Sequence, residues 1–274
     1  MTVVAVPIAT LWRSPETTDP DDVLTQLLLG EPFLVEEVRA DGWVRGVALD
    51  QPADRLDPRG YPGWLAPGQL GANSTAAGGR PYTVDSMRTT LRAAPDGAPA
   101  LADVWVGTRL SAVGDPVGGW LPVRVPGHDA PLWAVRDDLA PAGPGDPLAL
   151  AHRMVGTAYV WGGLSPSGID CSGLVHLSWR RYGVTVPRDA ADQTAATTPV
   201  PAGAERPGDL YIFARPGKPV HHIGFVVGPR RMLHACYTQG RVVVEPIRDD
   251  RQATLIGARR VPLPRPPAGG RAGS

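Results

Sequence analysis

The segment GIDCSGLVHLSWRRYG, residues 168–183, decides how the C-terminal part of this chain is interpreted. Asp170 is a favourable N-cap residue, apolar residues then recur at helical spacing, and Gly183 favours a helix end. The segment therefore predicts a helix that begins at Cys171. A thiol in the first turn lies near unpaired N–H groups and the positive end of the helix dipole, which favour the thiolate. Cys171 is then either a buried core residue or a reactive nucleophile.

The composition excludes several function classes. Lys plus Arg and Asp plus Glu number 27 each in 274 residues, so net charge gives no reason to expect a nucleic acid or an anionic membrane as partner. The two cysteines form no CxxC and no Cys/His zinc spacing, so we predict no metal and no cofactor. The N-terminus has no basic region before its apolar residues. We therefore expect no signal peptide, no lipid anchor, no transmembrane helix and a cytoplasmic location.

Two stretches rich in Gly and Pro, residues 71–81 and 141–147, predict linkers. They divide the chain into three expected domains, 1–72, 80–140 and 145–263. Residues 264–274 form a Pro- and Gly-rich end that predicts a disordered tail.

The first two segments are similar to each other. TLWRSPE at 10–16 matches TLRAAPD at 90–96, and each segment has a DGW or GGW turn before a closing GW or LW strand. Short strands with alternating apolar residues predict a small, partly open barrel in each segment. These segments resemble the bacterial SH3-like domains that accompany cell-wall enzymes.

The third segment has a different pattern. Asp146 and Pro147 predict the start of a helix, and the helix at Cys171 follows. Short apolar runs then predict a series of strands, at 209–213, 221–228, 231–237, 241–247 and 254–261. Helices followed by strands predict an α+β domain.

Three histidines on these strands are candidates to activate the thiol. Side chains alternate along a strand, so only one of His221 and His222 is expected to face Cys171. His234 can lie beside that histidine on the next strand. One histidine can take the thiol proton while the second fixes its tautomer, so Cys–His–His is a chemically complete set.

The motifs YVWGG, DCSGLV, HHIGFVVG and MLHA occur in this order between residues 159 and 235. They resemble the NlpC/P60 family of papain-like cell-wall peptidases. The resemblance implies a papain-like catalytic domain. It also implies Cys171 as nucleophile, His222 as general base, His234 as the polar third member and Tyr159 as an oxyanion-site or thiol-positioning hydroxyl.

Two SH3-like domains before such a domain resemble the dipeptidyl-peptidase branch of this family. That resemblance implies a substrate that is a murein peptide with a free N-terminal L-Ala, cut between γ-D-Glu and the diamino acid. It implies four substrate-binding residues, Asp170, Ser172, Tyr61 and Glu31.

Two details of the sequence accompany this assignment. We expect Arg188 to hold the neighbouring Asp189. Ala190 stands where the family often has a serine, so it lacks a hydroxyl that could bind substrate.

Two other functions fit the same sequence. The first is a secreted peptidoglycan endopeptidase whose SH3-like domains anchor it to the wall. The second is a wall-binding module with a retired active site, against which the intact set of Cys171, His222, His234 and Tyr159 argues.

Overall fold

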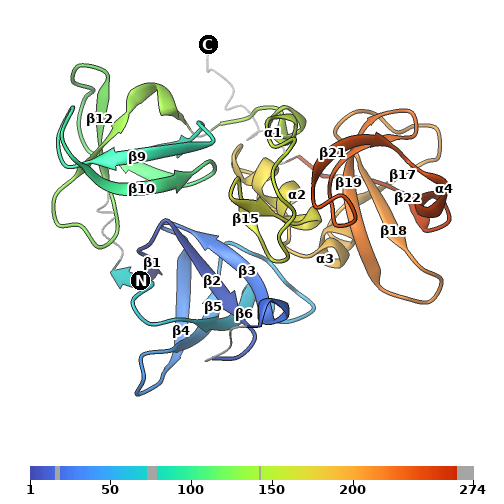
Figure 1. The fold of residues 1–274 in the computed structure, drawn as a ribbon, viewed down its shortest axis with the longest axis horizontal. Helices are drawn as coiled ribbons and strands as arrows, with labels where there is room; N and C mark the ends of the chain where they lie inside the picture. The colour runs from blue at the N-terminus through green and yellow to red at the C-terminus, as the bar shows by residue number, and fades with distance from the viewer. Residues whose placement is uncertain (16–18, 73–78, 142, 264–274) are drawn as a thin grey trace, which may run out of the picture.

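The computed structural model describes residues 1–15, 19–72, 79–141 and 143–263, which follow one another as three parts in Figure 1. Residues 73–78 of the first expected linker, residue 142 of the second and the expected tail, 264–274, lie outside the described residues. Within the described ranges, no helix has both the length and the apolar character needed to cross a membrane.

The first part is a seven-stranded antiparallel sheet with the strand order β3-β2-β6-β5-β4-β1-β7. Its elements are β1 (Thr2–Val4), β2 (Ile8–Trp12), the 3-10 helix η1 (Pro20–Asp22), β3 (Val23–Leu28), β4 (Pro32–Val38), β5 (Val44–Ala48), β6 (Tyr61–Leu65) and β7 (Leu70–Ala72).

The second part is a sheet of the same kind, with the order β10-β9-β13-β12-β11-β8-β14. Its elements are β8 (Arg80–Val84), β9 (Arg88–Arg92), β10 (Pro99–Trp105), β11 (Arg109–Ala112), β12 (Trp120–Arg124), β13 (Leu132–Val135), the 3-10 helix η2 (Arg136–Asp138) and β14 (Leu139–Pro141). Replacing each strand of the first sheet by its counterpart, seven places later in the chain, reproduces this order. The repeat inferred from the sequence is therefore present in the topology.

The two sheets differ in one connection that matters for the site. The segment between β5 and β6, residues 49–60, is longer than its counterpart between β12 and β13, residues 125–131. Gly60 closes the longer segment with φ 150°, and a Cβ there would lie 2.2 Å from the carbonyl oxygen of Ala48. Only glycine fits this close approach, which brings the chain back to β5 and starts β6 at Tyr61.

The third part combines helices with a six-stranded antiparallel sheet, order β17-β22-β18-β19-β20-β21. Its elements are α1 (Pro147–Arg153), β15 (Leu164–Ser165), β16 (Gly168–Ile169), α2 (Cys171–Arg180), α3 (Ala190–Ala195), β17 (Thr198–Val200), β18 (Leu210–Ala214), β19 (Val220–Gly228), β20 (Arg231–Cys236), β21 (Arg241–Pro246), α4 (Asp249–Gln252) and β22 (Leu255–Arg260). All five strands expected from the sequence are present, and the expected helices α1 and α2 begin where predicted. The fold class, an α+β domain preceded by two small all-β units, is confirmed.

Helix α2 is buried along its whole length, including its polar residues Ser172, His176, Ser178 and Arg180. It packs on β19 and β20, and the same hydrophobic core takes in Leu28 of the first part and Val106 of the second. In Figure 1, α2 lies between the two N-terminal sheets and the six-stranded sheet. The helix that carries Cys171 is thus held by all three parts of the chain.

Candidate active site

A pocket of about 550 Å³ opens at the first turn of α2. The first sheet and its 49–60 segment supply Arg13, Val23, Leu24, Arg55, Leu56 and Tyr61. The third part supplies Tyr159, Trp161, Asp170, Cys171, Ser172, Asp189, Ala190, Ala191, Pro219, Val220 and His221. Of the predicted site residues, the lining brings together Cys171, Tyr159, Asp170, Ser172 and Tyr61.

Cys171 is 8% exposed and stands at the start of α2, directly after its N-cap. Burial, assisted by the negative charge of Asp170, raises the pKa of the thiol to about 12. Backbone N–H groups of Ser172 and Ile223 act against this rise without overcoming it. The helix terminus therefore favours the thiolate as expected, but desolvation outweighs it, and the resting group is a neutral thiol.

The two predicted catalytic histidines are hydrogen-bonded to each other. His222 Nε2 lies 2.8 Å from His234 Nδ1, and His234 Nε2 lies 3.0 Å from Glu245 Oε1 on β21. Burial lowers the pKa of His222 well below its usual value and lowers that of His234 to about 4. Both rings are therefore neutral at neutral pH.

The neighbouring His221 has surroundings different from those of His222. Its neighbours Val220 and His222 pair with Ala214 and Phe213 of β18, and the register shifts between these pairs. This bulge lets the exposed His221 line the pocket while His222 is buried against His234.

Tyr159 precedes α2 in a bridge to Ile169 and lines the pocket beside Cys171. Its ring packs edge-on against Tyr237, with ring centroids 5.5 Å apart. Burial, followed by the proximity of Cys171, raises the pKa of its hydroxyl above the usual value. The hydroxyl stays protonated and can donate a hydrogen bond.

Asp170 is paired with Arg188 in a buried, two-pronged ion pair. Its Oδ2 lies 2.7 Å from Nη2 of Arg188, and its Oδ1 lies 3.0 Å from Nη1. Oδ1 also accepts from the N–H of Gly173, as an N-cap does, and Oδ2 accepts from the N–H of Gly162. The expected pairing of Arg188 with Asp189 is therefore wrong, since the guanidinium reaches back to Asp170 instead.

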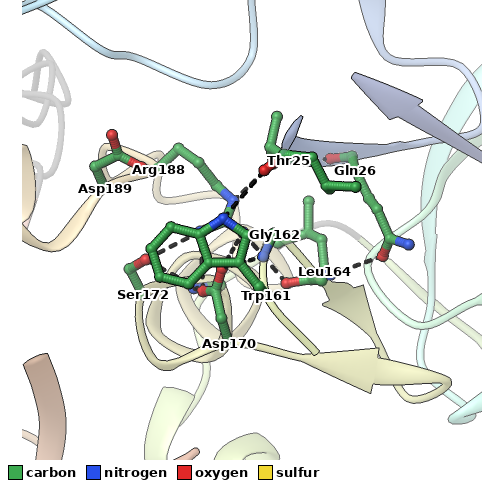
Figure 2. Close-up of polar contacts among 12 residues, drawn as sticks. Thr25, Gln26, Trp161, Gly162, Leu164, Asp170, Ser172, Arg188 and Asp189 are labelled. Carbon is green, nitrogen blue, oxygen red and sulfur yellow. Dashed lines mark hydrogen bonds and ion pairs between the residues drawn. The ribbon is translucent and has the colours of Figure 1, made fainter. Parts of the chain in front are cut away.

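Arg188 uses all five of its N–H donors. Besides Asp170, they reach Ser172 Oγ at 3.0 Å and the carbonyl of Gly163 at 3.3 Å. Its Nε donates to Thr25 Oγ1 on β3 at 2.7 Å, as Figure 2 shows. Thr25 on the first sheet therefore accepts the remaining hydrogen bond of the Arg188 guanidinium, which belongs to the third part of the chain.

Further contacts fix the first sheet against the loop before α2 (Figure 2). The indole N–H of Trp161 donates to the carbonyl of Val23, and the N–H of Leu164 donates to Oε1 of Gln26. These contacts place β3 along one wall of the pocket.

Tyr61 and Arg55 of the first part both contact Asp189 across this wall, with Arg55 Nη2 3.5 Å from Asp189 Oδ2. The Tyr61 hydroxyl donates to Asp189 Oδ2 at 3.2 Å. The side chain of Asp189 is 29% exposed, whereas that of Asp170 is 8% exposed and saturated with donors. Asp189 was not predicted from the sequence to line the pocket. The feature that could have indicated it is its position directly after Arg188.

Glu31 is not brought to the pocket. Its side chain is fully buried, accepting from the N–H of Leu28 and from Gln51 Nε2, and it lies 3.4 Å from Arg180 of α2. Burial raises the pKa of its carboxyl. The structure thus gives Glu31 a place in the contact between β3 and α2, and its expected role in substrate binding has no geometric support.

The described residues contain one group of three potential metal ligands whose ligand atoms lie within 4.8 Å of one another: His234, Cys236 and Glu245. Arg251 already contacts this group, with Nη2 3.1 Å from Cys236 Sγ and Nε 3.7 Å from Glu245 Oε1.

Part of the chain matches a known protein family. Residues 156–260 match the model of the NlpC/P60 family, so this part of the chain is an NlpC/P60 domain.

Over most of its length the chain is similar to two curated proteins named gamma-D-glutamyl-L-lysine dipeptidyl-peptidase. The one from Bacillus cereus is 28% identical, over 89% of this chain and 80% of the relative. The one from Bacillus subtilis is 28% identical, over 86% of this chain and 90% of the relative. A crystal structure of an NlpC/P60 family protein from Bacillus cereus has the same fold, with a TM-score of 0.84 and 24% identity over 95% of this chain and 99% of that chain. The comparisons support a peptidoglycan peptidase activity of the NlpC/P60 type.

The Asp170–Arg188 pair predicts a strong effect on stability. Arg188→Met should lower the free energy of unfolding by about 3–5 kcal/mol, because it leaves a buried carboxylate without its counterion. Urea denaturation followed by tryptophan fluorescence measures this loss. The matched control is Arg88→Met, which removes an arginine from an exposed ion pair with Asp103 and should leave stability near that of the wild type. Equal losses in both variants would contradict the argument.

The buried histidines predict a stability that depends on pH. His176, His222 and His234 all have pKa values lowered by burial, to about 3 for His176 and about 4 for His234. The unfolded chain takes up protons on these rings as the pH falls below about 6.5, while the folded chain does not. The free energy of unfolding should therefore fall as the pH drops from 6.5 to 5.5, by up to about 1.4 kcal/mol per pH unit for each histidine. A constant free energy between pH 7 and 5.5 would show that these rings are not buried as neutral groups.

Proposed function

We propose that the protein is a cytoplasmic cysteine peptidase that recycles cell-wall peptides, cutting murein peptides with a free N-terminal L-Ala between γ-D-Glu and the diamino acid. The observation that carries the proposal is the pocket shared by Cys171 and the first sheet. One wall of it holds Tyr61 and Asp189, the acceptor side that a substrate ammonium requires. Relatives matched over most of the chain carry this dipeptidyl-peptidase name.

The geometry supports a role for Asp189 as the carboxylate that receives the ammonium group. Asp170 was the candidate from the sequence, but Arg188 and two backbone N–H groups already satisfy its oxygens. Asp189 lines the pocket, is partly exposed and is oriented by the Tyr61 hydroxyl. A charge-assisted hydrogen bond from the ammonium to Asp189 would place the scissile bond relative to Cys171.

The reaction follows from the neutral resting state. As Cys171 Sγ attacks the γ-carbonyl carbon of D-Glu, its proton passes to His222. The oxyanion is stabilised by N–H groups in the first turn of α2 and by the Tyr159 hydroxyl. His222 then gives the proton to the amine of the diamino acid as the C–N bond breaks, which leaves a thioester on Cys171. Water, deprotonated by His222, hydrolyses this thioester, releases L-Ala-D-Glu and restores the thiol.

Ala190 and Ala191 give the pocket an apolar stretch where the family often has a serine hydroxyl. The substrate's D-Glu moiety is therefore held mainly by polar groups on the other walls. Ser172, which accepts from Arg188 Nη1, retains a second lone pair for this purpose.

The first test concerns the reaction. The wild-type protein, incubated with L-Ala-γ-D-Glu-diaminopimelate, should release L-Ala-D-Glu, which mass spectrometry detects. Cys171→Ala should abolish the product because no other group in the pocket can form the thioester. The exposed-site control Asp54→Asn, in the 49–60 segment, should match the wild type. Equal activity of the wild type and Cys171→Ala would overturn the mechanism.

The second test concerns the ammonium group. Asp189→Asn should lower kcat/KM for the free peptide about 10- to 100-fold, because it removes a hydrogen bond between charged partners. The wild type should cut the N-acetylated peptide poorly, and Asp189→Asn should discriminate little between the acetylated and free peptides. If the wild type cuts both peptides equally fast, the protein is an endopeptidase without a terminal-amine requirement.

A further inference from the structure

A series of hydrogen bonds runs from the buried His222 to the edge strand β21 of the sheet and ends at Glu245. His222 on β19 contacts His234 on β20, which contacts Glu245 on β21, at 2.8 and 3.0 Å. Gln239 Nε2 donates to the second carboxylate oxygen of Glu245 at 2.7 Å. Both carboxylate oxygens of Glu245 therefore accept a hydrogen bond, one from His234 and the other from Gln239.

This terminal acceptor determines where the protons lie on both rings. An ionised carboxylate only accepts hydrogen bonds, so His234 must carry its proton on Nε2. His234 is neutral, so its Nδ1 is then an acceptor, and His222 must carry its own proton on Nε2. The lone pair of His222 is consequently on Nδ1, the nitrogen that is not committed to His234.

We propose that Glu245 is a positioning residue that fixes the tautomers of both histidines, so that His222 presents an unprotonated Nδ1 to the thiol of Cys171. The inference rests on the proposed function for its catalytic consequence, whereas the tautomers themselves are a property of the folded protein. Glu245 touches neither substrate nor nucleophile and acts through His234.

The surroundings of Glu245 favour this role over metal binding. A metal ion held by His234, Cys236 and Glu245 would have to break the bond between His234 and Glu245. It would also meet the guanidinium of Arg251, which already lies 3.1 Å from Cys236 Sγ and 3.7 Å from Glu245 Oε1. The positive charge beside the carboxylate is therefore supplied by the chain itself.

The charges that face the histidine pair predict a shift in the pH profile. Arg251 and Arg248 lower the pKa of His234, whereas Glu245 raises it. His234, His221 and Arg251 lower that of His222. Removing the negative charge of Glu245 should lower the proton affinity of the pair further. The acid limb of kcat/KM should therefore move to lower pH.

The decisive variant is Glu245→Gln, which keeps the shape but adds an amide that can donate to His234 Nε2. The expected kcat/KM is about tenfold or more below wild type, short of the full contribution of a general base. Nitrogen-15 NMR of the imidazoles should show Nε2–H tautomers for His222 and His234 in the wild type and a mixture in the variant. Gln239→Met, which loosens the carboxylate without touching a histidine, should cause smaller changes in the same direction.

The control is Glu37→Gln, which removes an exposed carboxylate paired with Arg45 on the first sheet and should change neither readout. Wild-type tautomers and wild-type kcat/KM in Glu245→Gln would overturn the inference. If the wild type shows the Nε2–H tautomers but does not cut the murein peptide, the proposed substrate fails and the role of Glu245 stands. A lower melting temperature with unchanged tautomers and pH profile would mark Glu245 as a purely structural residue.

Discussion

The structure around the pocket depends on the burial of one ion pair, Asp170–Arg188. The desolvation of a buried arginine costs more free energy than its ion pair recovers, unless every N–H donor also has a hydrogen-bond acceptor. Here the acceptors come from three places: the residues flanking Cys171, the loop before α2 and Thr25 on the first sheet. The pair therefore orients the start of α2, which carries Cys171, and ties that helix to the neighbouring sheet.

The two N-terminal sheets share a strand order but make different contacts with the third part of the chain. The first supplies Arg55, Leu56 and Tyr61 to the pocket through the segment that ends at Gly60. The second lines no part of that pocket, and instead it packs on α2 through Val106 and binds Arg181 through Asp85. The elongated connection in one copy of the repeat thus supplies part of the wall of the candidate site.

The sequence predicted local features better than partnerships between distant segments. The cap at Asp170, the start of α2 and the five strands follow from periodicity and capping, which act over a few residues. The partner of Arg188, the buried place of Glu31 and the link from His234 to Glu245 depend on contacts across 11 to 163 residues of chain. The raised pKa of Cys171 was missed for a related reason, because desolvation is set by the covering sheet and not by the helix that carries the thiol.

The contact between Arg188 and Thr25 also bears on whether the chain is modular. The expected linkers and the two similar sheets suggest that the chain consists of three independent units. A catalytic segment cut free at residues 141–147 would nevertheless leave the indole N–H of Trp161 and the Nε of Arg188 without their protein acceptors. The first sheet therefore completes the polar contacts of the third part, and the chain cannot be divided there without leaving N–H donors of the third part unpaired.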